Sequence, residues 1–111
     1  MVYIREAHAL DSRAPAGGDG NPIVEDPRTA DERRAVAQVC MSKLELGLIP
    51  ALIDDMDDTA NEAYAGWPDR LYLIDRDGQV AYHGGRGPFG FLPDELEAAI
   101  EVELARIEAE R

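Results

Sequence analysis

The stretch LYLIDRDGQVAYH, residues 71–83, carries the clearest structural signal in this sequence. Two runs rich in β-forming residues flank an Asp-Gly pair, and this pattern is typical of the tight turn of a β-hairpin. The sequence therefore predicts two antiparallel strands, over residues 71–74 and 79–83.

The residues after the hairpin predict a loop and then a helix. The loop GGRGPFG, residues 84–90, is rich in glycine, which gives its backbone access to unusual dihedral angles. Pro93 fits the first turn of a helix, where Asp94 and Glu95 would face its positive end. An apolar stripe at helical spacing would line one face of this helix, comprising Leu96, Ile100, Leu104 and Ile107.

The residues before the hairpin predict alternating strands and helices. Thr29 and Glu32 have the spacing of a capping box, so a helix should begin near Ala30 and stop at Gly47. Strands are expected over residues 2–7 and 51–53, with a short helix over 59–65. This alternation predicts an α/β fold with a partly parallel sheet. The first helix should bury an apolar face made of Val36, Val39, Cys40 and Leu44.

Composition limits the classes of function. The 111 residues fit one domain, and an apolar fraction of 45% allows a packed core. A net charge of −12 would repel nucleic-acid phosphates and anionic lipid, so neither nucleic acid nor membrane is an expected partner. The single cysteine allows neither an internal disulfide nor a cysteine-based zinc site, and no cofactor or metal is expected.

Three stretches resemble the iodothyronine deiodinases: VYIREAH at residues 2–8, PDRLYLIDRDGQVAYHGGRGP at 68–88, and LPDELEAAIEVEL at 92–104. The resemblance covers nearly the whole chain and is weakest over residues 9–26, where clustered turn formers predict a flexible surface loop. It implies a thioredoxin-like three-layer sandwich. It also implies an oxidoreductase in which a selenolate or thiolate reductively removes iodine from an aromatic ring, with an external thiol as reductant.

In that family a strand and a helix carrying the redox nucleophile precede the stretch that resembles VYIREAH. Residues 1–111 are therefore expected to form one partial thioredoxin-like domain, incomplete because the first strands and the nucleophile helix are missing, and inactive alone. A selenocysteine codon, UGA, read as a stop would explain a start at Met1. The open sheet edges could support self-association.

Three residues are candidates for the site. Glu6 and His8 alternate along the end of a strand, so the carboxylate can orient the imidazole. The resemblance implies that this pair delivers a proton and that His8 also binds substrate; a solvated strand end is the alternative. Arg86 lies in GGRGP, where its guanidinium could fork onto a carboxylate or phenolate, and the resemblance implies a substrate clamp. An ordinary loop arginine is the alternative.

Other residues invite weaker interpretations. Cys40, on an apolar helix face, should be buried and unreactive, and His83 should simply end a strand. The aspartates following the strand at 51–53 lack the glycine and glutamate of a calcium loop, so a solvated strand end is expected. Pro27 stands where many deiodinases have a histidine that helps to grip hormone, which leaves thyronine recognition open.

Two other functions stay open. The chain could be a non-catalytic binding module on a thioredoxin fold, or a general thioredoxin- or peroxiredoxin-like redox protein, although Pro68 lies one residue before the place of the usual cis-proline. The expected partners are a small aromatic or anionic substrate and a thiol reductant. The sequence has no membrane span or signal peptide, so a cytoplasmic location is expected.

Overall fold

A computed structural model of the chain describes residues 1–6 and 25–111. His8 and most of the expected loop over residues 9–26 lie outside the described residues. The contacts divide the chain into two compact units, residues 1–67 and 68–111. Each unit is described by itself.

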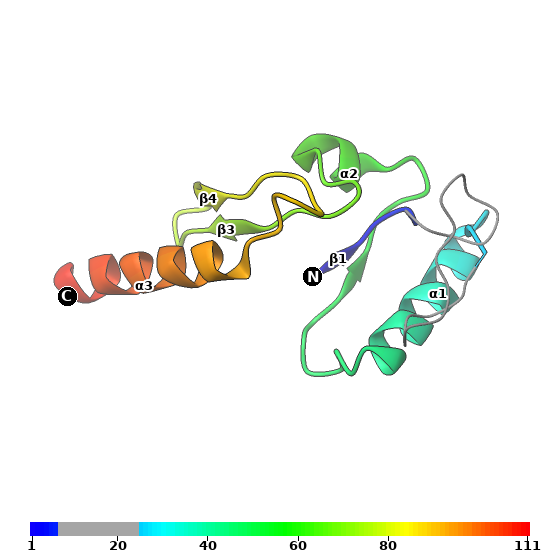
Figure 1. Cartoon of the computed structure of the whole chain (residues 1–111), viewed down its shortest axis with the longest axis horizontal. Coiled ribbons are helices and arrows are strands. Elements are labelled where there is room, and N and C mark those ends of the chain that lie inside the picture. The colour runs from blue at the N-terminus through cyan, green and yellow to red at the C-terminus, as the bar shows by residue number, and fades with distance from the viewer. Residues whose placement is uncertain (7–24) are drawn as a thin grey trace. The chain divides into compact units, whose positions relative to one another are not determined.

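Unit 1 is a βαβ arrangement followed by a short helix (Figure 1). Strand β1, Val2–Tyr3, pairs in parallel with strand β2, Leu52–Ile53, and helix α1, Ala30–Lys43, connects them. Helix α2, Thr59–Tyr64, follows β2. Both strands are shorter than the sequence predicts, but the order of elements and the parallel pairing agree with the predicted α/β fold.

Helix α1 begins where the capping signal predicts. The Thr29 hydroxyl accepts a hydrogen bond from the Glu32 amide at 3.1 Å, and the Glu32 carboxylate accepts one from the Arg28 amide at 2.7 Å. The helix ends at Lys43, earlier than predicted, because Glu45 and not Gly47 adopts a left-handed conformation, with φ of 56°.

The buried face of α1 differs from the predicted one. Arg33 and Ala37 are buried, at 3% and 4% exposure, whereas Val39 and Leu44 are nearly half exposed. Arg33 sets which face of α1 is buried, because its guanidinium hydrogen-bonds to the segment that follows β2. The predicted apolar stripe is only half right, since Val36 and Cys40 are half-buried but Val39 and Leu44 are not, because this long-range anchor sets the rotation of the helix.

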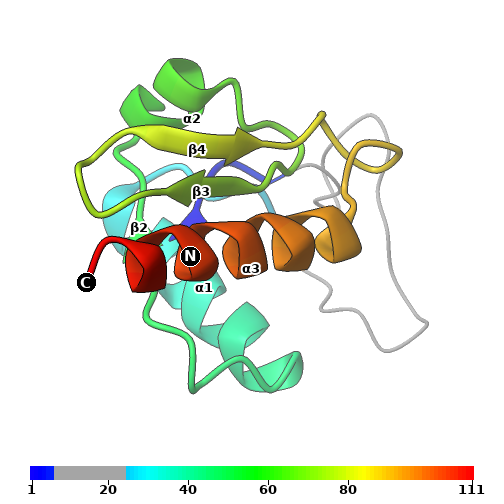
Figure 2. The same ribbon diagram turned by 90° about the vertical axis from the view of Figure 1, so that its left-hand side faces the viewer.

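Unit 2 is a β-hairpin backed by a helix. Strand β3, Tyr72–Ile74, pairs antiparallel with strand β4, Val80–His83, and Gly78 in the turn has a positive φ of 80°. Helix α3, Pro93–Ala109, runs alongside both strands (Figure 2). The hairpin and the proline-started helix are confirmed.

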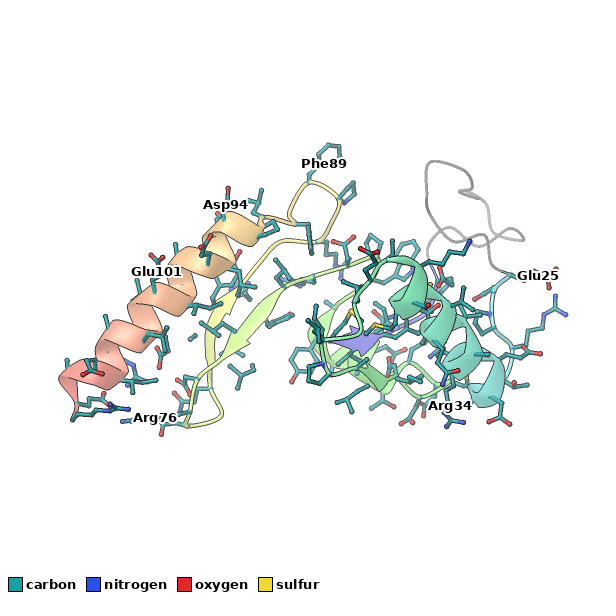
Figure 3. All side chains as sticks on the ribbon, turned by 90° about the horizontal axis from the view of Figure 1, so that it is seen from below. Glu25, Arg34, Arg76, Phe89, Asp94 and Glu101 are labelled. Atoms are coloured by element: carbon teal, nitrogen blue, oxygen red, sulfur yellow. The ribbon has the colours of Figure 1, made fainter. Side chains whose placement is uncertain are left out.

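The stripe predicted on α3 is only half right. Leu96 and Ile107 are half-buried, whereas Ile100 and Leu104 are 38% and 59% exposed. Large apolar side chains are also exposed elsewhere, and Phe89 projects outward from its loop at 93% exposure (Figure 3). None of the helices in the described parts of the chain is long and apolar enough to cross a membrane.

Candidate functional site

Glu6 lies just beyond β1, where neighbours hold it in place. The Tyr3 hydroxyl donates a hydrogen bond to the Glu6 carboxylate. The Trp67 indole N–H donates to the Glu6 backbone carbonyl at 3.4 Å. Burial and the Glu6 carboxylate together raise the pKa of Tyr3 far above its usual range, so the phenol stays a proton donor. Tyr3 is a neighbour of Glu6 that sequence reasoning missed.

Trp67 makes a second contact with the same segment. The Arg5 guanidinium lies 5.6 Å from the centroid of the Trp67 ring, within the range of a cation–π interaction. The indole thus contacts both Arg5 and Glu6. The predicted partner of Glu6, His8, lies outside the described residues, so their pairing stays a prediction.

Cys40 has the setting of an unreactive thiol. It is half-buried on α1, and burial, followed by the charge of Glu6, raises the pKa of its thiol. Because the thiolate is the nucleophile, a raised pKa lowers its reactivity. The structure therefore agrees with the expectation that Cys40 is not the redox nucleophile.

Two of the aspartates after β2, Asp54 and Asp58, are structural, which corrects the sequence-based expectation for them, whereas Asp55 and Asp57 are exposed as expected. Asp54 is 7% exposed, and its carboxylate accepts hydrogen bonds from the amides of Asp55, Ala60 and Asn61 at 2.8 to 2.9 Å. It thereby satisfies free amides at the start of α2. Among residues 1–6 and 25–111, no group of acidic, histidine or cysteine side chains could hold a metal ion.

Arg33 fixes the same segment from α1. Its guanidinium donates to the backbone carbonyls of Asp54, at 3.3 Å, and Asp55, at 2.8 Å. It also forms a 3.2 Å ion pair with Asp58, which is the N-cap of α2. These contacts join residues more than twenty positions apart, and they hold the end of β2 against α1.

Arg86 is presented by a tightly closed loop between β4 and α3. The Gly90 amide donates to the Arg86 carbonyl and the Gly87 amide to the Asp69 carbonyl, both at 2.9 Å. A Cβ atom on Gly90 would lie 2.3 Å from the backbone carbon of Gly85, so only glycine allows this approach. The Arg86 side chain itself is exposed.

The structure gives the two described candidate residues, Glu6 and Arg86, separate local settings. Glu6 belongs to unit 1 and Arg86 to unit 2. Pro27 is buried.

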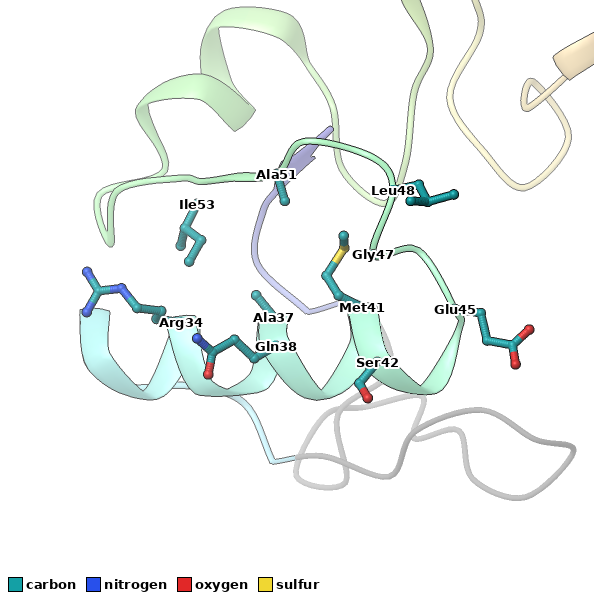
Figure 4. A pocket seen from close by; sticks show the side chains of 10 residues that line it. All are labelled: Arg34, Ala37, Gln38, Met41, Ser42, Glu45, Gly47, Leu48, Ala51 and Ile53. Atoms are coloured by element: carbon teal, nitrogen blue, oxygen red, sulfur yellow. The ribbon is translucent and has the colours of Figure 1, made fainter.

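A separate open groove of about 690 Å³ lies between α1 and β2, with Arg34 and Glu45 at opposite ends (Figure 4). Neither Glu6 nor Arg86 lines it.

Comparison with known proteins places the chain in a family. The family model for iodothyronine deiodinase matches residues 1–103. Thyroxine 5-deiodinase of Sparus aurata is 34% identical over 101 residues, which cover 91% of this chain and 36% of that protein.

Two further relatives agree. Type I iodothyronine deiodinase of Xenopus laevis is 33% identical over 91% of this chain and 38% of its own length. Type II iodothyronine deiodinase of Petromyzon marinus is 36% identical over 91% and 34%. The chain spans roughly a third of the length of these relatives. Because the family model covers nearly all of its residues, the chain belongs to the iodothyronine deiodinase family.

Proposed function

We propose that this chain forms the substrate-side part of a deiodinase-like oxidoreductase, which reductively removes halogen from an aromatic ring. The family match over residues 1–103 carries the proposal, because it includes both the segment with Glu6 and the loop with Arg86. A thioredoxin-like architecture is part of the proposal. The βαβ arrangement of unit 1 and the hairpin backed by α3 in unit 2 support it.

The redox nucleophile is proposed to come from outside these residues, because the half-buried Cys40 has a raised thiol pKa. A selenolate or thiolate takes the iodine, and the ring carbon keeps the electron pair of the broken carbon–iodine bond. An external thiol then attacks the sulfur or selenium, iodide leaves, and a second thiol restores the nucleophile. Two thiols are oxidised to a disulfide for each carbon–iodine bond reduced.

The residues of this chain would act on the proton and on the substrate's charge. The ring carbon that loses iodine needs a proton, which we assign to the Glu6–His8 pair, with Tyr3 fixing the carboxylate. Arg86 would hold an anionic group of the substrate, a phenolate or carboxylate, by paired N–H donors. Closure of the loop would restrict the positions that the Arg86 guanidinium can adopt.

The test is thiol-dependent iodide release by a protein extended upstream to include a cysteine or selenocysteine. Arg86→Ala and His8→Ala should each lower kcat/KM, His8→Ala by roughly a hundredfold, as expected for loss of a proton donor. Arg111→Ala, which removes an exposed arginine at the C-terminus, serves as the matched control and should change nothing. Unchanged rates in both site variants would eliminate the site proposal.

A further inference from the structure

Arg70 forms no ion pair within residues 68–111, although the chain is strongly acidic. It is half-buried and directly precedes the residues of the hairpin. Its neighbours are the Gly84 carbonyl, the His83 imidazole and the Tyr72 ring, and no carboxylate among the described residues of its own unit pairs with it. By contrast, Arg76, Arg106 and Arg111 of the same unit each form an ion pair with a glutamate.

The contacts of Arg70 use one side of its guanidinium. Its Nε donates to the Gly84 carbonyl at 2.6 Å, at the start of the loop that carries Arg86. Its centre lies 5.4 Å from the centroid of the Tyr72 ring. Nη2 lies 3.5 Å from His83 Nδ1, and Nη1 makes no hydrogen bond with any described residue. The outer edge, formed by Nη1 and Nη2, is therefore the edge that can take a ligand.

This outer edge has the geometry that carboxylates require. Nη1 and Nη2 can donate two parallel hydrogen bonds to the two oxygens of one carboxylate. A half-buried guanidinium without a negative partner gains most from such a ligand, because burial has already cost it part of its hydration. His83 Nδ1 lies beside the same edge and can accept from Nη2, which leaves the N–H of this exposed imidazole on Nε2, where it can donate to a ligand.

We propose that Arg70 and His83 form a carboxylate-binding subsite for an aromatic substrate that carries a carboxylate. Arg70 is joined to the loop that carries Arg86 by its hydrogen bond to the Gly84 carbonyl. This inference rests on the proposed function, because Arg86 is taken to hold the substrate. It also accounts for His83, to which sequence analysis assigned only a place at the end of a strand. Arg70 has a second task, since its bond to Gly84 fixes the base of the loop.

The probe is 3-(4-hydroxyphenyl)propionate, and its neutral amide is the matched control ligand. Binding to the full chain is followed by the NMR signal of the Arg70 Nε–H, which is identified by its loss in Arg70→Lys. The carboxylate should shift this signal saturably and bind at least about tenfold more tightly than the amide. Equal affinity for the acid and the amide, or an Arg70 signal that does not move, overturns the proposal.

Variants then separate the subsite from the loop. Arg70→Lys keeps the positive charge but loses the paired N–H donors of the guanidinium, so it should bind the carboxylate about tenfold more weakly. His83→Gln should lower the affinity about threefold. Arg76→Gln, which removes an arginine at the hairpin turn, should bind as the wild type does. If both Arg70→Lys and His83→Gln bind the carboxylate with wild-type affinity, the proposed subsite is overturned. If Arg70→Lys fails to fold, the affinity of His83→Gln and the NMR signal of the Arg70 Nε–H in the wild-type chain decide.

The same variants distinguish this inference from the proposed function. In the extended protein, loss of iodide release in Arg86→Ala, with an unchanged KM in Arg70→Lys and His83→Gln, would reject the subsite and keep the proposed function. A carboxylate-dependent shift of the Arg70 signal without iodide release in any preparation would keep the subsite and reject the function.

Discussion

Replacing Gly90 with alanine tests whether the loop that presents Arg86 is closed by direct contact between backbones. The φ of Gly90 lies outside the left-handed region, so alanine can adopt its backbone conformation. The added Cβ, however, would lie 2.3 Å from the backbone carbon of Gly85 and 2.6 Å from its carbonyl oxygen. Any effect of Gly90→Ala therefore reports this close approach.

The size of the effect follows from the distance. Ordinary van der Waals contact begins at 3.4 Å, so the backbone segments at Gly85 and Gly90 must separate by about 1 Å. Backbone, unlike the end of a flexible side chain, cannot step aside alone, and overpacking of this kind costs roughly 1–3 kcal/mol. The same movement would shift Arg86, and a displacement of about 1 Å can lower catalysis by roughly a hundredfold.

Urea unfolding followed by circular dichroism measures the loss of stability, and the KM for iodide release measures the shift of Arg86. Gly47→Ala is the matched control, because a Cβ there meets nothing within 4 Å. It should be neutral or stabilise by up to about 1 kcal/mol. Equal unfolding free energies for Gly90→Ala and Gly47→Ala would refute the reasoning.

Four further predictions concern the rest of the chain. Arg33→Ala should cost about 3–5 kcal/mol, because it leaves buried acceptors unpaired, whereas the exposed Arg34→Ala should cost less than about 1 kcal/mol in the same melts. Since the folded state raises the pKa of Tyr3, the free energy of unfolding should fall as pH rises above about 10. Tyr3→Phe should flatten this part of the plot of unfolding free energy against pH. An unchanged slope would contradict the prediction. The Cys40 thiol should react with iodoacetamide more slowly in the folded chain than in urea, and equal rates would show it to be accessible. Because Leu48 is fully exposed and Phe89 is 93% exposed, sedimentation should show concentration-dependent self-association, which a monomer at all concentrations would exclude.

Signals that act over a few residues predicted the fold well. The Thr29 cap, the Asp-Gly turn and Pro93 each satisfy backbone groups within their own neighbourhood, so the helix starts and the hairpin could be found from the sequence. The rotation of α1 could not, because it depends on Arg33 reaching acceptors that lie 21 to 25 positions away.

The candidate site was predicted only in part. The motifs identified Glu6 and Arg86 as residue types suited to the chemistry, but not the contacts that fix them. Tyr3 lies three positions from Glu6, and the bond between them depends on the bend after the two-residue β1. A longer regular strand would place these two side chains on opposite faces.

Iodide release in the extended protein, measured after changing each thiol or selenol in turn, tests most directly the claim that this chain supplies the substrate side of the reaction. We predict that Cys40→Ala keeps full thiol-dependent release, and that replacing the upstream cysteine or selenocysteine with serine abolishes it. Loss of release in Cys40→Ala, with release retained in the upstream serine variant, would contradict the account.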